Sequence, residues 1–365
     1  MIFNVQDYGA RGDGRTDDTD AIQLAVNAAS FDGGTVFIPP GTYILSQSIL
    51  LTDRITLAGA GMGTTVLKIA DNNNTRIVGL VRTPYGRGTR YVCVRDLTLD
   101  GNRDNQAEAE QVGFYCGVIP DQPMSDYDIS CLRVEAHHFH DYGFDPHEVV
   151  TRLTIVDCVS HHNGLDGFTL DGVQTSIVKG CVAFNNDRHG FNLVTKSSFC
   201  ILSQNLAYEN KGNGFTIQNG SHSNEVVGNL ARENGGDGLY SIEVNDNTFF
   251  NNTVLRNQQN GIRVRGGART TVIGNLVREN GQKQHNTYSE IVLDDTETSG
   301  ATDCMVANNN VISRGDIRAQ FGIDETAGVR GHEQERNAFL ANRIMGAATA
   351  NVSLNGRSTM QDHNI

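Results

Sequence analysis

Tryptophan is absent from the 365-residue chain, and proline is scarce, with six residues. No run approaches the about 18 apolar residues that a membrane-spanning helix needs, so the sequence predicts no membrane partner. Positive charge is also in short supply, because 29 Lys and Arg stand against 42 Asp and Glu, a formal net charge of −13. This balance excludes nucleic acid as the main partner, since neutralising phosphates requires a basic surface.

The seven cysteines are odd in number and form no CxxC pair. This pattern favours buried thiols over a disulfide framework or a zinc site. No basic, apolar signal peptide opens the chain, and the first strand is expected at Met1. We expect a single module over residues 1–365, because no linker separates two domains.

The dominant feature of the sequence is an internal repeat, in which a glycine followed by an apolar residue recurs every 23 or 24 residues. Each glycine opens a short strand-like run, and an asparagine precedes each later run. The glycines of this column are Gly143, Gly167, Gly190, Gly214, Gly238 and Gly261. The period, without helical heptads or a leucine-rich pattern, predicts a right-handed parallel β-helix in which like residues stack about 4.8 Å apart.

The repeat weakens outside its central part. Residues 15–30 have helical spacing after acidic residues, which predicts a short helix that caps the first coil. The stretches Gly101–Gln122 and Gln282–Asp303 break the period, and we expect both to leave the β-helix as loops.

Strand alternation turns the repeat into a map of the surface. The first and third positions after each glycine are mostly apolar, so the phenylalanines Phe144, Phe168, Phe191 and Phe215 are expected to stack inside. The second and fourth positions are mostly polar, and we expect them to face solvent.

One part of this polar strip concentrates groups that carry protons. Asp145 and His147 lie two residues apart on one face, roughly 7 Å between Cα atoms. Asp171 is expected beside His147 one coil later, and Tyr142 precedes the strand at the turn. We call Tyr142, Asp145, His147 and Asp171 the polar cluster and predict that it is catalytic.

The string YGFDPHE at residues 142–148 resembles the active-site motif of the catalytic modules of secreted, calcium-dependent mannuronan C5-epimerases. NGLDGF at 163–168 and NDRHGFN at 186–192 resemble further segments of the same modules, and the resemblance covers about residues 1–280. It implies that Tyr142, Asp145, His147 and Asp171 are catalytic. The residues predicted to bind substrate are Arg188, His189, Asn192, Gln218, Arg263 and Arg265.

The resemblance further implies an extracellular monomer that converts β-D-mannuronate to α-L-guluronate within alginate, an anionic polysaccharide, and depends on Ca²⁺. The acidic loop Asp100–Asn105 is an oxygen-rich candidate for calcium. Two departures from the family pattern affect contacts with the substrate carboxylate: Ile242 stands where a lysine is expected, and Gln106–Tyr115 lacks a matching lysine and aspartate.

The reaction requires a base on one face of C5 and an acid on the other, together with a group that neutralises the adjacent carboxylate. His147 is favoured as the base because its ordinary pKa suits neutral pH, and Tyr142 is then the acid, although the reverse assignment stays open. The same deprotonation followed by β-elimination describes an alginate lyase. A hydrolase using Asp294 and Asp295, or a β-helix that only binds glycan, are further alternatives.

Overall fold

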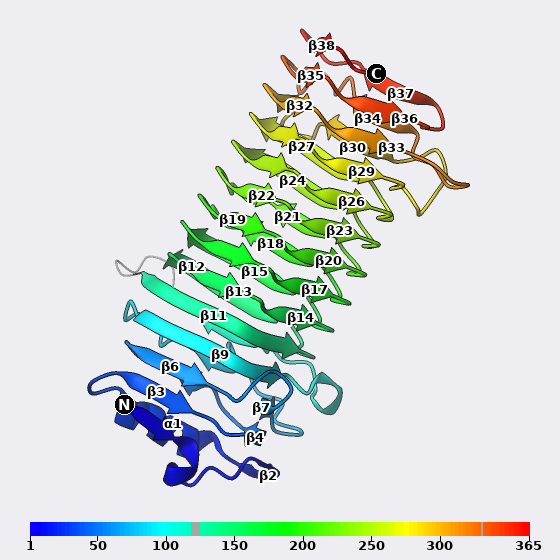
Figure 1. The fold of residues 1–365 in the computed structure, drawn as a ribbon. Helices are drawn as coiled ribbons and strands as arrows, with labels where there is room; N and C mark the ends of the chain where they lie inside the picture. The colour runs from blue at the N-terminus through cyan, green and yellow to red at the C-terminus, as the bar shows by residue number, and fades with distance from the viewer. Residues whose placement is uncertain (118–124, 330) are drawn as a thin grey trace. The chain divides into compact units, whose positions relative to one another are not determined.

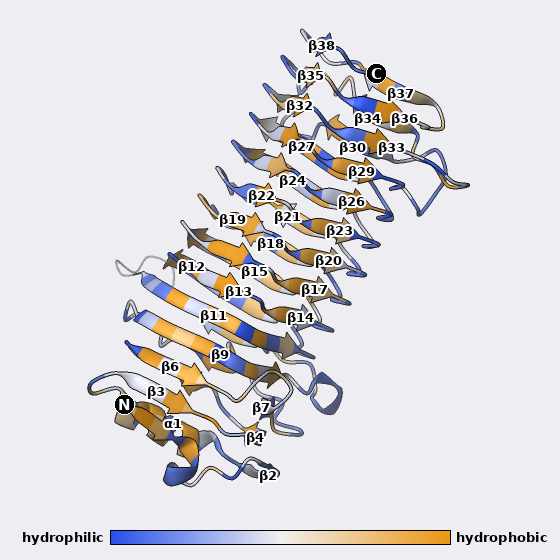
Figure 2. Ribbon diagram, in the orientation of Figure 1, coloured by the Kyte–Doolittle hydropathy of each residue, from blue (hydrophilic) through white to orange (hydrophobic). Residues whose placement is uncertain are grey.

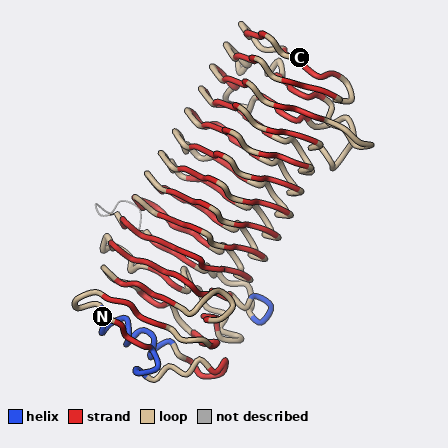
Figure 3. The backbone as a smooth tube through the Cα atoms, in the orientation of Figure 1, coloured by secondary structure: helices blue, strands red, loops and turns tan. Residues whose placement is uncertain are grey.

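The computed structural model describes residues 1–117, 125–329 and 331–365. By its internal packing the chain divides into two units, residues 1–187 and residues 188–365. Strands dominate both units, and helix is confined to the N-terminal unit within the described ranges (Figures 1 and 3). None of the helices in this described part has the length and apolarity to cross a membrane.

The first unit contains the α-helix α1 (Thr19–Ala29) and two short 3-10 helices, η1 (Val5–Tyr8) and η2 (Arg103–Asn105). Its strands are β1 (Ile2–Asn4), β2 (Asp13–Asp17), β3 (Gly34–Phe37), β4 (Gly41–Leu45), β5 (Ile49–Leu50), β6 (Ile55–Ala58), β7 (Thr65–Ile69), β8 (Val81–Arg82), β9 (Arg90–Asp100), β10 (Phe114–Cys116), β11 (Asp126–His137), β12 (Phe144–Thr151), β13 (Thr154–Val156), β14 (Val159–His161), β15 (Phe168–Gln174), β16 (Ile177–Lys179) and β17 (Val182–Phe184).

The second unit is built from strands within its described residues. These are β18 (Phe191–Val194), β19 (Ile201–Ser203), β20 (Leu206–Tyr208), β21 (Phe215–Ile217), β22 (Glu225–Val227), β23 (Leu230–Arg232), β24 (Leu239–Asn245), β25 (Thr248–Phe250), β26 (Thr253–Leu255), β27 (Ile262–Ala268), β28 (Thr271–Ile273), β29 (Leu276–Arg278), β30 (Ser289–Asp294), β31 (Ala301–Thr302), β32 (Met305–Ala307), β33 (Asn310–Ile312), β34 (Phe321–Glu325), β35 (Ala338–Leu340), β36 (Arg343–Met345), β37 (Ala350–Leu354) and β38 (Met360–Asp362).

The strands of each unit form parallel ladders, one strand from each coil. In the second unit one ladder runs β18, β21, β24, β27, β30, β34 and β37, and its neighbours start at β19 and β20. In the first unit the ladder β5, β8, β10, β12 and β15 carries the polar cluster, and we call it the site sheet. The predicted parallel β-helix is therefore confirmed.

The predicted N-terminal helix is present as α1. Its buried residues Ile22, Ala25, Val26 and Ala29 recur at helical spacing and form one apolar stripe. This stripe packs against β1, β3 and β5, the first strands of the coil. The helix thereby covers the open end of the ladders, where unpaired strand edges and core side chains would otherwise meet water.

The stacked phenylalanine column lies inside, as predicted. Phe144 and Phe168 are fully buried, and their ring centroids lie 4.7 Å apart at an interplanar angle of 12°. In the second unit Phe191 and Phe215 repeat this geometry at 4.7 Å and 5°. Burying each ring stabilises the fold by about 1.5–3 kcal/mol relative to an exposed ring. Figure 2 shows further apolar segments along other strands, such as β9 and β11.

The recurring glycines are required by close packing between coils. A Cβ atom on Gly214 would lie 2.7 Å from the carbonyl oxygen of Gly238, and one on Gly190 would lie 2.7 Å from that of Gly214. Any larger residue would push neighbouring coils apart, because these carbonyl groups belong to the ladder itself.

The asparagine columns form hydrogen-bonded ladders at the turns. Each Nδ2 donates to the Oδ1 of the next asparagine, from Asn205 through Asn229 and Asn252 to Asn275, at 3.0–3.1 Å. Within the second unit a second ladder runs from Asn210 to Asn280 and ends on a glutamate, Glu290, which accepts from Asn280 at 2.7 Å. These bonds satisfy buried polar groups that water cannot reach.

The structure tests the expectations for the cysteines and for the two stretches predicted to be loops. All seven cysteines are free, and all except the half-buried Cys93 are buried, as predicted. The expectation that Gly101–Gln122 is a loop is wrong in part, because β10 continues the site sheet; Gln122 itself lies outside the described residues. The expectation for Gln282–Asp303 is wrong in the same way, because β30 and β31 both pair with β27.

Candidate active site

The site sheet places the residues of the polar cluster on adjacent strands. His147 on β12 lies in register with Asp171 on β15, as the repeat predicts. Asp145 lies in register with Tyr115 on β10, and Tyr115 with Arg82 on β8. Five side chains with polar or ionisable groups thus occupy neighbouring positions over four coils.

One imidazole nitrogen faces two carboxylates. Nδ1 of His147 lies 3.6 Å from Oδ1 of Asp145 and 3.4 Å from Oδ2 of Asp171. These are ion-pair separations, and the His147 Nδ1 atom, Asp145 Oδ1 and Asp171 Oδ1 are buried without a hydrogen-bond partner in the described structure. Leaving three such atoms unsatisfied is unfavourable, so the site has hydrogen-bonding capacity for a ligand.

Burial and charge shift the protonation of this group. Burial raises the pKa of Asp145, whose side chain is 8% exposed. The interaction with Asp145 raises the pKa of His147 to about 9. His147 is therefore an imidazolium at neutral pH before a substrate binds. The argument that its ordinary pKa suits a base at neutral pH no longer holds.

An aromatic wall borders the imidazole. The Tyr115 ring stacks on His147 with centroids 5.8 Å apart and an interplanar angle of 25°. Tyr85 meets Tyr115 edge-on at 5.7 Å, and Tyr142 packs against the apolar group that contains Tyr115. The structure thus brings Tyr142 to the same wall as His147, and the predicted polar cluster is assembled.

A buried guanidinium belongs to this wall and was not predicted. The Arg82 Cζ atom lies 3.4 Å from the Tyr85 ring centroid, and its Nη2 atom is buried without a hydrogen-bond partner in the described structure. Such a stacked guanidinium is a cation with a free donor, suited to a carboxylate. A signal for this wall was present, because Gly113-Phe114 repeats the glycine–aromatic pattern of Gly143-Phe144.

The second position after the glycine is buried in four of the six repeats, which corrects the expectation that it faces solvent. Asp145, Thr169, Asn192 and Thr216 are between 1% and 6% exposed. Side chains from the turns and the adjacent positions cover them: Asp166 accepts a hydrogen bond from Thr169 Oγ1 at 3.0 Å, and Asn213 donates one to Thr216 Oγ1 at 3.1 Å. The alternation of residues along a strand does not reveal that other side chains cover these positions.

The predicted substrate-binding residues belong to the second unit. Gln218 Nε2 donates to Asn192 Oδ1 at 3.1 Å, and His189 Nδ1 accepts from the Asn213 backbone at 2.9 Å. Arg188 begins the unit and accepts the Gly212 backbone N–H through its carbonyl oxygen. These contacts place Asn192 beside Gln218 within this unit.

Arg263 and Arg265, also predicted to bind substrate, contact Asp294 and Asp295. Arg263 pairs with Asp294 through its Nε atom, 3.1 Å from Oδ2. Arg265 Nε donates to the carbonyl oxygen of Asp295 at 3.1 Å. A hydrolytic role for this aspartate pair loses support, because the Asp294 carboxylate is held by Arg263 and the Asp295 carboxylate accepts the Val329 N–H.

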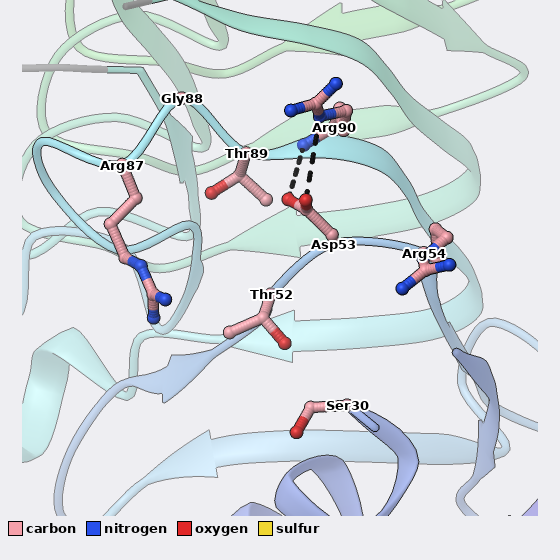
Figure 4. A pocket seen from close by; sticks show the side chains of 8 residues that line it. All are labelled: Ser30, Thr52, Asp53, Arg54, Arg87, Gly88, Thr89 and Arg90. Carbon is pink, nitrogen blue, oxygen red and sulfur yellow. Dashed lines mark hydrogen bonds and ion pairs between the residues drawn. The ribbon is translucent and has the colours of Figure 1, made fainter. Parts of the chain in front are cut away.

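A basic hollow of about 320 Å³ lies elsewhere in the first unit (Figure 4). The arginines Arg54, Arg87 and Arg90 line it together with Asp53. Asp53 accepts the Arg90 N–H at 3.1 Å and pairs with its guanidinium at 3.6 Å, as the dashed lines in Figure 4 show. Three cations against one anion make this hollow suitable for an acidic sugar.

The first carboxylate of the loop Asp100–Asn105, the predicted calcium candidate, already has partners in this structure. Asp100 Oδ1 accepts the Asn102 N–H at 2.8 Å, and Oδ2 lies 3.9 Å from the Lys68 ammonium. Calcium takes six to eight oxygen ligands, and two imidazoles, His137 and His138, stand beside Asp100 together with the Lys68 ammonium. Calcium dependence and its site both stay predictions.

Comparisons with known proteins identify the family of the chain. Residues 2–216 match a family model described as rhamnogalacturonase A/epimerase, pectate lyase-like. Mannuronan C5-epimerase AlgE4 of Azotobacter vinelandii is 47% identical over 205 residues, 54% of this chain and 37% of that protein. Alginate lyase 7 of the same organism is 44% identical over 205 residues, 54% of this chain and 24% of that protein. This chain thus spans well under half the length of either relative.

A solved structure resembles the whole chain. The A-module of mannuronan C-5 epimerase AlgE6 from Azotobacter vinelandii superposes with a TM-score of 0.92 at 34% identity. The match covers 100% of this chain and 98% of that module.

Proposed function

Because the chain belongs to the pectate-lyase-like rhamnogalacturonase A/epimerase family, and within it to the mannuronan C5-epimerase A-modules, we propose that it epimerises mannuronate to guluronate within alginate. The observation that carries the proposal is the His147 Nδ1 atom between two carboxylates, with Tyr142 at the same aromatic wall. A proton-transfer reaction needs such groups, whereas a glycan-binding surface does not.

The substrate carboxylate must first be neutralised, because a proton next to a charged carboxylate is very weakly acidic. We propose that Asp145 does this as a neutral acid, since burial raises its pKa. The Arg82 guanidinium assists from the aromatic wall. The unpartnered Oδ1 atoms of Asp145 and Asp171 provide hydrogen-bonding positions for this role.

We propose that His147 then removes the C5 proton and that Tyr142 delivers a proton to the opposite face. Before the polymer binds, His147 is protonated at neutral pH, so its proton must pass to Asp145 and the substrate carboxylate when the polymer binds. The Tyr115 ring stacked on His147 keeps the imidazole oriented and limits its contact with water. Arg188, His189, Asn192, Gln218, Arg263 and Arg265 remain the proposed contacts to neighbouring sugars.

The extracellular location, the action as a monomer and the use of calcium are parts of the same proposal. A divalent cation would link a polymer of uronates to a chain with a net charge of −13. The basic hollow formed by Arg54, Arg87 and Arg90 is a further surface on which sugar carboxylates would bind.

Proton NMR of poly-mannuronate incubated with the protein and calcium tests the activity. We expect new guluronate signals with the polymer length retained, and none with the Tyr142→Phe variant. Similarity to an alginate lyase supports β-elimination as a second candidate, and ultraviolet absorbance of an unsaturated product reports it. Absence of guluronate together with strong absorbance would replace the epimerase proposal by the lyase.

A further inference from the structure

A second group of ionisable residues lies at the other end of the first unit's strands. Five residues at or near the ends of β7, β9, β11, β14 and β17 stand in register, one coil after another. They are Lys68, Asp100, His137, His161 and Phe184. The rings of His137 and His161 stack at 5.0 Å and 13°, so the ladder holds imidazoles at the spacing of the coils.

A second imidazole accompanies each histidine of this ladder. His138 and His162 have φ values of 55° and 56°, a left-handed turn directly after the strand. In an extended strand consecutive side chains point to opposite faces, and the turn cancels that alternation. The two added rings stack on each other at 5.2 Å and 8°. We call His137, His138, His161 and His162 the histidine quartet.

The paired rings present their nitrogens to each other. The Nδ1 atoms of His137 and His138 are 2.7 Å apart, and those of His161 and His162 are also 2.7 Å apart. In a neutral pair one nitrogen carries a proton and the other a lone pair. A metal ion can take the place of that proton after a small separation of the rings, because two zinc-bound nitrogens at about 2.0–2.1 Å are separated by roughly 3.3 Å, about 0.6 Å more than here.

A carboxylate completes one of the two pairs. Asp100 Oδ1 lies 3.7 Å from His137 Nδ1, and the ligand atoms of Asp100, His137 and His138 all lie within 4.8 Å of one another. These residues line a hollow of about 270 Å³ that also contains Asp104 and Lys68. An ion therefore has room to enter together with bound water.

The neighbouring coil provides the support that metal-binding histidines need. Glu135 Oε1 lies 3.2 Å from Nε2 of His161, and its other oxygen accepts the Thr98 hydroxyl at 2.8 Å. A carboxylate in that position holds the proton on Nε2 and leaves Nδ1 as the donor atom. His161, stacked on His137, thus forms an oriented layer beneath the proposed ligands.

The local charge favours a cation. Asp100, Asp104 and Glu135 contribute three carboxylates, while Arg103 is paired with Asp187 at 3.1 Å. Lys68 is the opposing cation, but at 3.9 Å from Asp100 its ion pair is long and partly exposed, and such pairs contribute little. An anionic sugar would meet these carboxylates at the wall of the hollow.

We propose that Asp100, His137 and His138 bind a divalent transition-metal ion of the Zn²⁺ type. Two imidazoles and one carboxylate suit zinc, copper or nickel and do not suit calcium, which prefers oxygen alone. The site is separate from the polar cluster in its residues, and the proposal does not depend on the proposed epimerase activity.

Isothermal titration of the untagged, chelator-treated chain with ZnCl₂ and, separately, with CaCl₂ tests this site. We expect one zinc ion to bind at least about tenfold more tightly than calcium, and zinc to raise the Tm. The double variant His137→Gln/His138→Gln should weaken that affinity by at least about tenfold, because even loss of supporting residues costs 10–100-fold. Asp100→Asn is the second variant, for the case that the double variant does not fold.

Two controls separate this site from other histidines. His222→Gln removes an imidazole in the second unit and should leave zinc binding unchanged. His147→Gln removes the imidazole of the polar cluster, whose His147, Glu148 and Asp171 also lie within reach of one ion. Zinc affinity that survives His137→Gln/His138→Gln, or that disappears with His147→Gln, would overturn the proposal. Oligomannuronate binding that requires the quartet, without zinc binding, would overturn it too.

Discussion

At the scale of single residues, the central feature is an imidazole, His147, that lies within ion-pair distance of two carboxylates, Asp145 and Asp171. His147 is about one-third exposed, whereas Asp145 and Asp171 are largely buried. The acidic neighbours stabilise the imidazolium, and burial disfavours two carboxylate charges without a cation. The protonation of His147 and that of Asp145 therefore depend on each other, and the pH dependence of the reaction reports on this pair.

The first prediction concerns this pH dependence. In the proposed mechanism the proton of His147 stays within the site and moves to Asp145, so kcat/KM should stay level below about pH 9 and fall above it, where that proton is lost. Initial rates at low polymer concentration across pH 6–10 measure this. A rise of about tenfold per pH unit up to pH 9 would contradict the proposal, because it would show that the proton must leave the site before the reaction.

The second prediction concerns the acid and the base themselves. His147→Gln and Tyr142→Phe should each lower turnover by about 10²–10⁴-fold, because each removes one proton-transfer group. Guluronate formation measured by NMR gives the rates. Tyr208→Phe and His222→Gln are the matched controls and should retain near-normal rates. Variants of His147 and Tyr142 with ordinary turnover would leave the polar cluster without a catalytic role.

The third prediction concerns the buried guanidinium. Arg82→Lys keeps the charge but loses the planar group that stacks on Tyr85 at 3.4 Å. A charged hydrogen bond to the substrate carboxylate contributes about 1.5–3 kcal/mol, so kcat/KM should fall by about 10–100-fold. Arg87→Lys, in the basic hollow, is the comparison. Equal kcat/KM for Arg82→Lys and the unchanged chain would assign Arg82 a packing role alone.

At the scale of elements, each turn of the coil is closed by a polar ladder whose members satisfy one another. In the second ladder, from Asn210 to Asn280, each Nδ2 donates to the Oδ1 of the next asparagine at 2.9–3.0 Å. Glu290 then accepts in place of a further asparagine. Glu290 is fully buried, and burial raises its pKa to about 7. This one residue couples the stability of the ladder to pH.

The fourth prediction follows from that coupling. Because the folded-state pKa of Glu290 is raised, the folded chain binds its proton more tightly, and stability falls as pH rises from about 4.5 to about 7. Glu290→Gln should remove this loss and raise the free energy of unfolding at pH 8 by roughly 1–3 kcal/mol. Thermal unfolding at pH 5 and pH 8 measures it. The exposed Glu297→Gln control should show no such difference, and an effect of Glu290→Gln that is the same at both pH values would contradict the account.

The glycine column and the aromatic column explain which elements the sequence alone predicts well. A step of 23 or 24 residues assigns Phe144, Phe168, Phe191 and Phe215 to the core, because each coil repeats the same packing. β10 was missed because 30 residues separate Gly113 from Gly143, and this longer coil breaks the period. Arg82 was missed with it, since its partner strand was taken for a loop.

Exposure and protonation in the polar strip could not be obtained from the repeat. Thr169 and Thr216 are covered by Asp166 and Asn213 through side-chain hydrogen bonds that a column of letters does not contain. The charge of His147 depends on two distances, 3.4 and 3.6 Å, which only coordinates provide. The alignment of His147 with Asp171 was predictable from the repeat, whereas the protonation of His147 was not.

At the scale of the whole molecule, the family membership and the full-length match to an epimerase A-module assign a shared architecture to the entire chain. The protein carries a net charge of −13, yet its proposed substrate is a polyanion. We propose that local cations resolve this conflict, namely Arg82 in the aromatic wall and the arginines of the basic hollow. The proposed activity would then depend on where these cations stand, rather than on the overall charge.

The central claim is that one group takes the C5 proton and a different group returns a proton to the opposite face. Poly-mannuronate converted by the protein in D₂O, and then examined by NMR, tests this claim most directly. Every new guluronate should carry deuterium at C5, because the returning proton comes from a group in exchange with solvent. New guluronate that retains the original hydrogen at C5 would contradict the two-sided mechanism.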